Sequence, residues 1–233
     1  MNKKKYISLA KKSADIQINE LKKIKKIFNN SFVKAVDLIL NCKGKVIFAG
    51  VGKSGLIARK ISATFSSIGI PSFFCDPAQA LHGDMGQIER KDILIIFSYS
   101  GNTSELNNML KFANRFRIKI IGVASKPESI LLKASDIKLV IPKVKEADVI
   151  GMVPTSSTSI TLLLGDCLAT TVMSCRKFSR DKFKIFHPGG NIGNSLLLAK
   201  DIMITGKKMP VINNNKNFKE ALKVMNEKKL GIL

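Results

Sequence analysis

Tryptophan is absent from this chain of 233 residues, and histidine occurs only twice. Acidic residues are also scarce, because 17 aspartate and glutamate residues stand against 39 lysine and arginine residues and leave a net charge of +22. Such a charge is typical of proteins that bind nucleic acids or anionic membranes. Here the lysines are scattered through every segment without a nucleic-acid-binding motif, and the lack of tryptophan leaves few surfaces on which bases stack. We therefore expect solvated basic faces and no nucleic-acid partner.

Paired cysteines and long hydrophobic runs are missing as well. Cys42, Cys75, Cys167 and Cys175 show no C-x-x-C spacing, and each lies in or beside an apolar segment, which is typical of reduced thiols in a core. The N-terminal lysines precede no apolar stretch of signal-peptide length, and no run is long enough to span a bilayer. These absences predict a cytoplasmic protein with no membrane partner.

Helical patterns are present at both ends of the main domain. Apolar residues within 7–28 recur at spacings of three and four, which predicts one long helix whose apolar stripe packs on the sheet or on a second subunit. A second apolar helix is predicted at about residues 155–175. Its length and its Asp166 favour a core or subunit contact over a membrane span.

Five short apolar runs between these helices predict the strands of a sheet: KVIFAG, PSFFCD, DILIIFS, IKIIGVAS and IKLVIP. Because the runs are continuously apolar and are separated by helical stretches, they indicate a parallel sheet covered on both faces. The predicted fold class is α/β, with a doubly wound five-stranded parallel sheet flanked by helices. Ligands of such sheets bind outside the carboxyl ends of the strands. We assign this domain to residues 1–200 and expect a boundary at about Asp201.

The loop after the first predicted strand, residues 50–55, reads GVGKSG and permits two interpretations. It matches the G-x-G-x-x-G fingerprint of dinucleotide-binding folds, and Asp76 ends the second strand, where a ribose-binding acid would stand. Alternatively, the glycines serve only a tight strand-to-helix turn. A Walker phosphate loop is excluded, because Ile47 occupies the position of its first glycine.

The loop after the third predicted strand, residues 98–105, reads SYSGNTSE and gathers hydroxyl groups at the start of a helix. Unpaired backbone N–H groups and the helix dipole both favour an anion at such a point, so we expect a phosphate site. A helix cap alone would need a single Ser or Thr, and a dinucleotide-binding fold does not require this second loop.

Several motifs follow one another in order: GVGKSG, FFCDPAQALHGDMG, SYSGNTSE, KEA before PTSSTS, and HPGG. In this combination the chain resembles the sugar-isomerase (SIS) domain family, and within it the arabinose 5-phosphate isomerases, up to about Lys200. The resemblance implies an aldose–ketose isomerase that interconverts D-ribulose 5-phosphate and D-arabinose 5-phosphate without a cofactor and feeds synthesis of keto-deoxy-octulosonate for lipopolysaccharide. It also implies a homotetramer whose active sites are completed by neighbouring subunits.

The same resemblance assigns site residues. The positions that the family treats as catalytic fall on Lys53, Glu105, Glu146 and His187. Those that hold the sugar phosphate fall on Ser54, Ser98, Ser100 and Thr103, and further substrate contacts fall on Gly69, Ile70, His82, Asn108, Arg117, Pro142, Lys143 and Val144. Asp76 stands where related enzymes can carry a histidine that binds inhibitory zinc, which makes it the candidate metal position.

Aldose–ketose interconversion moves a proton between adjacent carbons through an enediol, which requires a base, an acid and support for an oxyanion. Glu105 and Glu146 are the possible bases, Lys53 supplies a cation, and His187 is suited to proton transfer at a hydroxyl during ring opening. The sequence leaves open which glutamate acts on carbon. Structural alternatives also stay open: Glu105 favouring a helix dipole, Glu146 as a solvated charge, and structural histidines.

Residues 201–233 resemble the start of a CBS domain, which follows the isomerase domain in longer members of the family. All proposed site residues precede Asp201, so we expect catalysis not to depend on this segment. Two other functions remain open from the sequence. One is a non-catalytic SIS module that binds a sugar phosphate and regulates a partner, and the other is a dinucleotide-dependent oxidoreductase.

Overall fold

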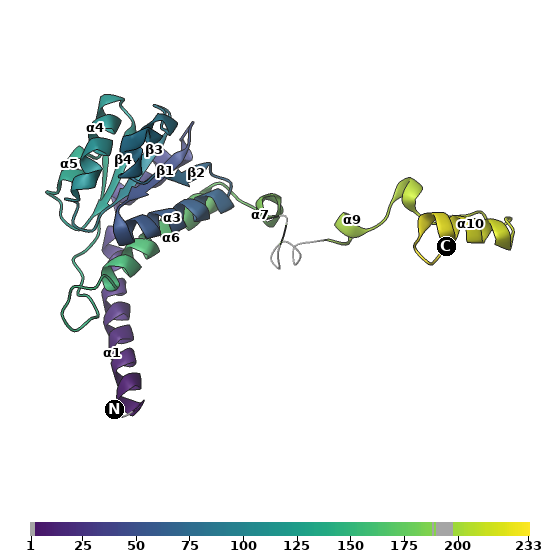
Figure 1. The fold of residues 1–233 in the computed structure, drawn as a ribbon, viewed down its shortest axis with the longest axis horizontal. Coiled ribbons are helices and arrows are strands. Elements are labelled where there is room, and N and C mark those ends of the chain that lie inside the picture. The colour runs from purple at the N-terminus through teal and green to yellow at the C-terminus, as the bar shows by residue number, and fades with distance from the viewer. Residues whose placement is uncertain (1–2, 188, 190–197) are drawn as a thin grey trace. The chain divides into compact units, whose positions relative to one another are not determined.

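The computed structural model describes residues 3–187, 189 and 198–233. The chain divides into two compact units, Met1–Phe186 and His187–Leu233, of which the first contains the sheet (Figure 1). The first unit ends with the short helix α7 (Arg180–Phe186), so the units separate before the expected boundary at residue 200.

Five parallel strands form the sheet of the first unit, as the sequence predicted. They are β1 (Val46–Gly50), β2 (Ser72–Phe74), β3 (Ile93–Phe97), β4 (Lys119–Ala124) and β5 (Ile137–Val140). Their order is β2-β1-β3-β4-β5, with every neighbouring pair parallel. The chain moves outward from β1 to β2 and then returns to the other side of β1 to form β3, so the winding reverses between β1 and β3. Such a reversal opens a crevice at the carboxyl ends of the strands.

Alternate side chains of the central strands enter two separate cores, which explains why their sequences are continuously apolar. Phe48 and Ile95 belong to the core shared with α2 (Asn30–Leu40), α3 (Gly52–Ser67) and α6 (Ser156–Cys175). Ile47 and Leu94 belong to the core shared with α4 (Asn107–Arg115) and α5 (Ile130–Ala134). Helices therefore cover both faces of the sheet (Figure 1), and the predicted doubly wound α/β fold is confirmed.

The predicted N-terminal helix consists of two parts, α1 (Lys3–Leu21) and the 3-10 helix η1 (Lys22–Ile27). Helix α1 buries none of its residues, and Ile7 and Ile18 of the expected stripe are 59% and 53% exposed. By contrast, Ile24 and Ile27 of η1 enter the core. Only the C-terminal end of the apolar stripe is therefore covered within one chain. Three further 3-10 helices lie in the loops of this unit: η2 (Gln79–His82), η3 (Asp84–Gln87) and η4 (Ser104–Leu106).

Helix α6 is the predicted second apolar helix, and it packs against α1, α2 and α3. A Cβ atom on Gly165 would lie 2.6 Å from the Ile61 side chain of α3, so the two helices need glycine at this point. Among the described helices, α6 alone is long and apolar enough to cross a membrane, which corrects the expectation that no run has this length. Burial of Ile160, Leu164 and Leu168 accounts for its composition as that of a core helix.

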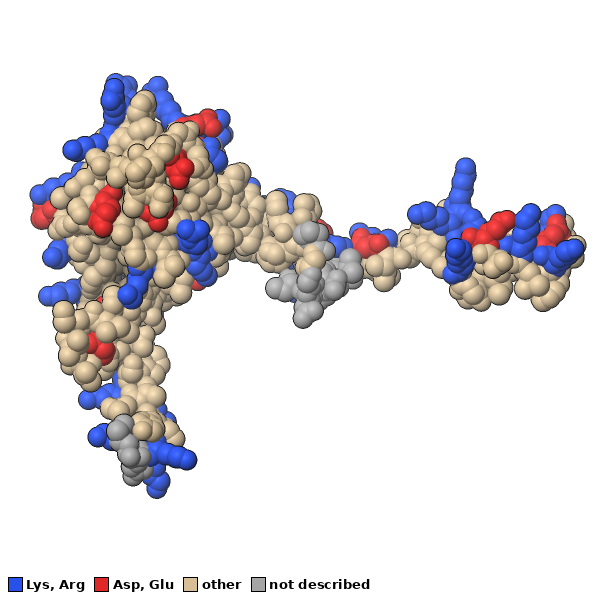
Figure 2. All heavy atoms as spheres, viewed as in Figure 1, with Lys and Arg blue, Asp and Glu red and all other residues tan. Residues whose placement is uncertain are grey.

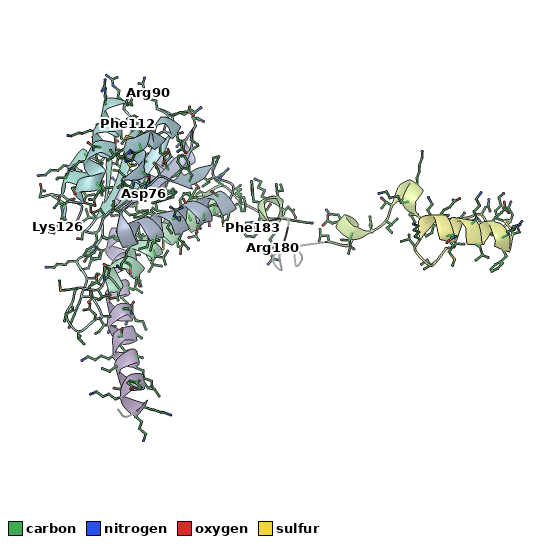
Figure 3. All side chains as sticks on the ribbon, viewed as in Figure 1. Asp76, Arg90, Phe112, Lys126, Arg180 and Phe183 are labelled. Atoms are coloured by element: carbon green, nitrogen blue, oxygen red, sulfur yellow. The ribbon has the colours of Figure 1, made fainter. Side chains whose placement is uncertain are left out.

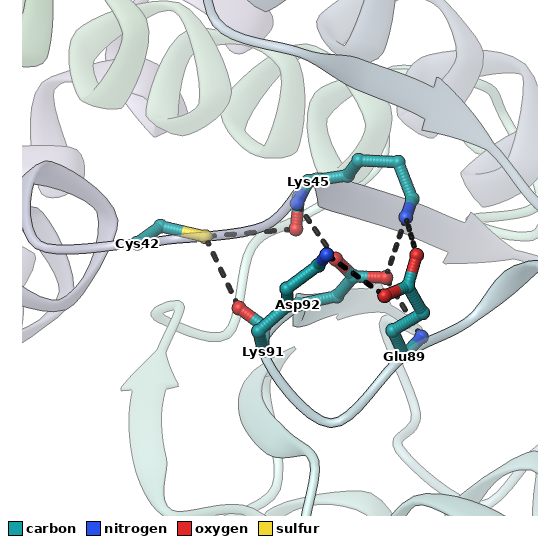
Figure 4. Close-up of polar contacts among 5 residues, drawn as sticks. All are labelled: Cys42, Lys45, Glu89, Lys91 and Asp92. Carbon is teal, nitrogen blue, oxygen red and sulfur yellow. Dashed lines mark hydrogen bonds and ion pairs between the residues drawn. The ribbon is translucent and has the colours of Figure 1, made fainter.

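A buried carboxylate organises the amino-terminal edge of the sheet, on the side opposite the crevice (Figure 4). The Asp92 side chain is fully buried and accepts hydrogen bonds from the backbone N–H groups of Lys45 at 2.7 Å and Glu89 at 2.8 Å. The Lys45 ammonium group lies 3.1 Å from a carboxylate oxygen of each of these two acids. This network joins the chain that enters β1 to the chain that enters β3.

The four cysteines are free thiols of differing exposure. Cys75 is buried, and burial, followed by the charges of Asp84 and Asp76, raises the pKa of its thiol to about 11. Cys42 and Cys167 are partly buried, whereas Cys175 is exposed, so the prediction of a core position is wrong for Cys175.

Basic side chains are dispersed over both units. In Figure 2, lysine and arginine side chains project from many elements of the visible face and are interleaved with acidic ones rather than gathered into a single patch. This distribution agrees with the interpretation of the positive charge as solvated faces.

The second unit contains α9 (Ala199–Ile202), the 3-10 helix η5 (Gly206–Lys208) and α10 (Phe218–Lys228). Helix α10 is the amphipathic helix that the sequence predicts near the C-terminus. It begins with a capping box, in which the Asn217 side chain accepts from the Glu220 N–H at 3.0 Å and the Glu220 carboxylate accepts from the Asn217 N–H at 3.1 Å. The resemblance of this segment to a CBS domain stays a prediction.

Candidate active site

A cavity of about 920 Å³ opens at the carboxyl ends of the strands, as the winding of the sheet predicts. The loops after β1, β3, β4 and β5 surround it together with the start of α6. Its lining contains eight of the residues proposed from the sequence: Lys53, Ser54, Ser98, Ser100, Thr103, Lys143, Val144 and Glu146. It also contains residues that the sequence did not single out, among them Tyr99, Ser125, Lys126, Lys145, Ser157, Thr158 and Thr161.

The loop after β3 presents hydroxyl groups in a fixed geometry. The Ser98 and Thr103 hydroxyl oxygens lie 2.8 Å apart, and the Gly101 N–H donates to the Ser98 hydroxyl at 3.1 Å. The Asn102 N–H donates to the Ser100 hydroxyl at 3.3 Å. The hydroxyl groups of Ser98, Ser100 and Thr103 line the cavity and suit an oxyanion such as a phosphate.

Gly101 is required for the shape of this loop. Its φ of +70° lies in the left-handed region, and a Cβ atom at this position would lie 2.2 Å from the Ser129 hydroxyl oxygen. The neighbouring Asn102 side chain accepts a 3.0 Å hydrogen bond from the Ile130 N–H, which ties the loop to the start of α5. The loop is thus held against the start of α5.

Helix α3 directs its N-terminus toward the same cavity, because Lys53 and Ser54 lie in its first turn and line the cavity. The residue before the helix, Val51, provides no side-chain cap, so the first N–H groups are open to an anion. The glycines of GVGKSG are explained by the turn itself. Gly52 has a φ of +58°, and a Cβ atom on Gly55 would lie 2.6 Å from the carbonyl oxygen of Gly50.

Glu146 faces these groups from the loop that leads into α6. Its Oε2 atom accepts three hydrogen bonds, from the Thr155 N–H at 2.8 Å, the Thr155 hydroxyl at 3.0 Å and the Ser157 N–H at 3.2 Å. Partial burial acts to raise the pKa of the Glu146 carboxyl, but the bonds from Ser157 and Thr155 outweigh it and hold the pKa below its ordinary value. Glu146 is therefore an ionised and oriented carboxylate, not a freely solvated charge.

Four lysines line the cavity: Lys53, Lys126, Lys143 and Lys145. Lys126 and Lys145 were not proposed from the sequence, although each follows the carboxyl end of a strand, β4 or β5 (Figure 3 marks Lys126). The strand-end rule that singled out the loops after the first and third strands would have found them. Four ammonium groups with one lining carboxylate make the cavity suited to a dianionic ligand.

Glu105 does not line the cavity. Its side chain is exposed at the start of η4 and accepts a 2.9 Å hydrogen bond from the Ser104 hydroxyl. Its own backbone N–H, followed by that hydroxyl, lowers the pKa of the carboxyl. Within one chain, the geometry fits the alternative in which Glu105, in the first turn of η4, favours the helix dipole.

Six proposed substrate contacts lie outside the cavity lining: Gly69, Ile70, His82, Asn108, Arg117 and Pro142. Gly69 and Ile70 precede β2 and Arg117 precedes β4, so these three lie at the amino-terminal edge of the sheet, away from the cavity. His82 and Asn108 are exposed on η2 and α4, respectively. Pro142 directly precedes the lining residue Lys143.

Asp76 follows the end of β2 (Figure 3), and its carboxylate accepts a 2.9 Å hydrogen bond from the Ala78 N–H, which forms the turn into η2. Within the described part of the chain, no group of three His, Cys, Asp or Glu residues is placed to hold a metal ion. The observed contacts of Asp76 are those of a turn residue.

His187 is half-buried and is the first residue of the second unit. The HPGG motif continues through Pro188 and Gly190, which lie outside the described residues. The catalytic assignment of His187 is therefore a proposal that rests on the motif.

Sequence comparisons relate the chain to sugar-phosphate enzymes. Residues 39–171 match the family model described as "SIS domain". Protein RP505 of Rickettsia prowazekii is 42% identical over 231 residues, which cover 99% of this chain and 72% of the relative. Arabinose 5-phosphate isomerase KdsD of Salmonella typhi is 39% identical over 95% of this chain, and that of Escherichia coli K12 is 39% identical over 91%. The chain spans 68% and 65% of the lengths of these two isomerases.

Solved structures agree with this relationship. The protein c3406 of E. coli CFT073, in complex with arabinose 5-phosphate, superposes with a TM-score of 0.78 at 34% identity and covers 81% of this chain. A putative sugar-phosphate isomerase of Listeria monocytogenes superposes equally well at 30% identity, again over 81% of the chain. Each of the two structures is matched over its full length.

Proposed function

The chain belongs to the SIS domain family and to the sugar-phosphate isomerases within it, and from this premise we propose that it interconverts D-ribulose 5-phosphate and D-arabinose 5-phosphate. One observation carries the proposal. A hydroxyl-rich anion loop and an oriented carboxylate, Glu146, line the same cavity at the switch point of the sheet. The relatives named arabinose 5-phosphate isomerase and the neighbour bound to arabinose 5-phosphate support this choice of substrate.

The phosphate of the sugar binds at the loop after β3 and the N-terminus of α3. Ser54, Ser98, Ser100 and Thr103 supply hydroxyl groups, and the first N–H groups of α3 add the positive end of a helix dipole. Anchoring the phosphate places the aldehyde or ketone end of the five-carbon chain at a fixed distance from it. The remote phosphate thereby orients the two carbons between which the proton moves.

Glu146 is our candidate for the base that moves the proton between the two carbons. It is the carboxylate that lines the cavity, whereas Glu105 lies outside the lining in one chain. Its lowered pKa keeps it ionised at neutral pH, so it is ready to accept a proton. Lys53, in the first turn of α3, stabilises the oxyanion of the enediol as charge develops.

The remaining proposed residues belong to the assembled enzyme. We place His187 at ring opening and propose a homotetramer in which neighbouring subunits complete each site, as the family resemblance implies. Contacts such as His82, Arg117 and Gly69, which lie outside the cavity of one chain, would then reach a site from another subunit. By the same resemblance, the product feeds keto-deoxy-octulosonate synthesis in the cytoplasm.

The decisive experiment follows the conversion of ribulose 5-phosphate by the purified protein in the presence of EDTA, with chromatography of the sugar phosphates. Formation of arabinose 5-phosphate is expected, because the proposed chemistry uses protein acids and bases and no metal. Absence of product, with sugar phosphate still bound, would replace the proposal by a regulatory binding module or by a different sugar substrate. Light scattering after size exclusion tests the oligomer, and an active monomer would contradict it.

A further inference from the structure

Tyr99 connects three of the loops that build the cavity. It lies between Ser98 and Ser100 in the loop after β3, and it lines the cavity. Its carbonyl oxygen accepts hydrogen bonds from the Ser125 N–H at 2.8 Å and the Ser125 hydroxyl at 2.7 Å, in the loop after β4. Its phenolic oxygen accepts a 2.9 Å hydrogen bond from the N–H of Val144, in the segment after β5. One residue therefore joins the phosphate loop to both neighbouring loops.

The segment that carries Glu146 has little regular structure of its own. Residues 141–155, all of which are described, form no helix or strand. The Ile141 N–H still pairs with β4 through the Ala124 carbonyl, and the Ala147 N–H donates to the Thr155 hydroxyl. Between these two points, the bond from Val144 to Tyr99 holds the backbone two residues before Glu146.

A second side chain supports the same segment from helix α1. The backbone N–H of Lys145 interacts with the Glu20 carboxyl. Burial acts to raise the pKa of this carboxyl, but the interactions with Lys23 and Lys145 outweigh burial, and the pKa lies below its ordinary value. Loss of the tyrosine hydroxyl would therefore loosen the segment without releasing it. Tyr99 also packs against the core that the sheet shares with α2, α3 and α6, and phenylalanine would retain this contact.

We propose that Tyr99 is a positioning residue for the isomerase reaction: its hydroxyl fixes the Val144 backbone and thereby sets the distance between the base Glu146 and a sugar whose phosphate is bound by Ser98 and Ser100. This inference rests on the proposed function. Tyr99 acts through the backbone of another loop and need not touch the reacting carbons. Because a displacement of about 1 Å in a catalytic group lowers rates by up to about a hundredfold, the hydroxyl matters for turnover more than for binding.

The test is Tyr99→Phe, which removes one oxygen atom and leaves the ring. The chain has two tyrosines, so Tyr6→Phe on the exposed face of α1 is the matched control. We expect Tyr99→Phe to lower kcat about tenfold, while KM for ribulose 5-phosphate and the inhibition constant of inorganic phosphate stay within about twofold, since the phosphate loop keeps its own hydrogen bonds. Tyr6→Phe is expected to match the wild type in all three constants.

A second readout does not depend on turnover. Hydrogen exchange of the Val144 amide, measured by NMR or by mass spectrometry of a peptide spanning residues 142–147, should accelerate in Tyr99→Phe and stay unchanged in Tyr6→Phe. A kcat of Tyr99→Phe within about twofold of the wild type, or a change in KM alone, would overturn the inference. Equal exchange rates of the Val144 amide in Tyr99→Phe and in the wild type would overturn it as well. A wild-type protein without turnover would instead defeat the proposed function, and the exchange measurement would still decide whether Tyr99 holds the segment.

Discussion

The carboxylate of Glu146 accepts a 2.8 Å hydrogen bond from the backbone N–H of Thr155, immediately before helix α6 begins. The two residues are nine positions apart in sequence, and the bond closes the loop between them, which contributes Gly151, Met152 and Pro154 to the cavity lining. The contact serves two purposes, because it satisfies a backbone donor at a helix N-terminus and fixes a charged group in the candidate active site. A substitution at Glu146 should therefore separate an effect on charge from an effect on shape.

Glu146→Gln should lower kcat by about a hundredfold or more, since general base catalysis typically contributes a factor of about 10² to 10⁴. The glutamine carbonyl oxygen can still accept the bond from Thr155, so the circular dichroism spectrum should be that of the folded wild type, and only the stability contributed by the charge of the carboxylate should be lost. Glu128→Gln, at an exposed glutamate paired with Lys133, is the control and should retain full activity. Wild-type turnover in Glu146→Gln would remove Glu146 from the mechanism.

The difference in the free energy of unfolding between the wild type and Glu146→Gln should become smaller as the pH falls. Because the pKa of Glu146 is lower in the folded protein than its ordinary value of 4.5, the carboxylate contributes stability above pH 4.5. That contribution is lost as the pH falls through the folded pKa. Urea unfolding at pH 7 and at successive values below 4.5 should show the difference between the two proteins shrinking. A difference that grows on acidification would contradict the observed hydrogen bonds.

Ser98→Ala should weaken sugar-phosphate binding. Ser98 is buried, with 4% of its surface exposed. Its hydroxyl contacts both the Thr103 hydroxyl and the Gly101 N–H. Removing a hydrogen bond to a charged ligand costs about 1.5 to 3 kcal/mol, so KM should rise by about tenfold or more. The control is Ser67→Ala, because the Ser67 hydroxyl donates only to the Thr64 carbonyl within α3 and does not line the cavity. An unchanged KM in Ser98→Ala would place the phosphate elsewhere in the cavity.

Asp92→Ala should destabilise the fold without altering the site. The change leaves the Lys45 and Glu89 N–H groups without their acceptor and the Lys45 ammonium group without its buried partner, at a cost of about 2 to 4 kcal/mol in the free energy of unfolding. Glu89→Ala removes an exposed carboxylate and its surface ion pairs with Lys45 and Lys91, and it should have a much smaller effect. Chemical denaturation measures both, and kcat/KM of the folded variants should equal that of the wild type. A loss of activity at full stability would contradict the assignment of Asp92 to the fold.

The sequence determined the fold class of the first unit and its five parallel strands. Central strands such as β1 and β3 are buried on both sides, so their residues are apolar without alternation, and this pattern belongs to covered parallel sheets. The rule that ligands bind at the carboxyl ends then identified the loops of Lys53 and Ser98, and both line the cavity. The same rule, applied to every strand, would also have selected Lys126 and Lys145.

Other features could not be predicted, because they depend on contacts between residues far apart in sequence. The apolar stripe within residues 7–28 continues along its whole length, but only the fold decides that Ile24 of η1 is covered and Ile7 of α1 is exposed. Glu105 and Glu146 are equivalent carboxylates in the sequence, and only the packing of α6 against the loop after β5 gives one of them three donors and a place in the cavity. The bond from Val144 to Tyr99 spans 45 residues, so no local pattern indicates it. Local periodicity thus set the strands and main helices along the chain. The tertiary structure decided which polar groups meet, because hydrogen-bond geometry depends on distances that the chain defines only after it has folded.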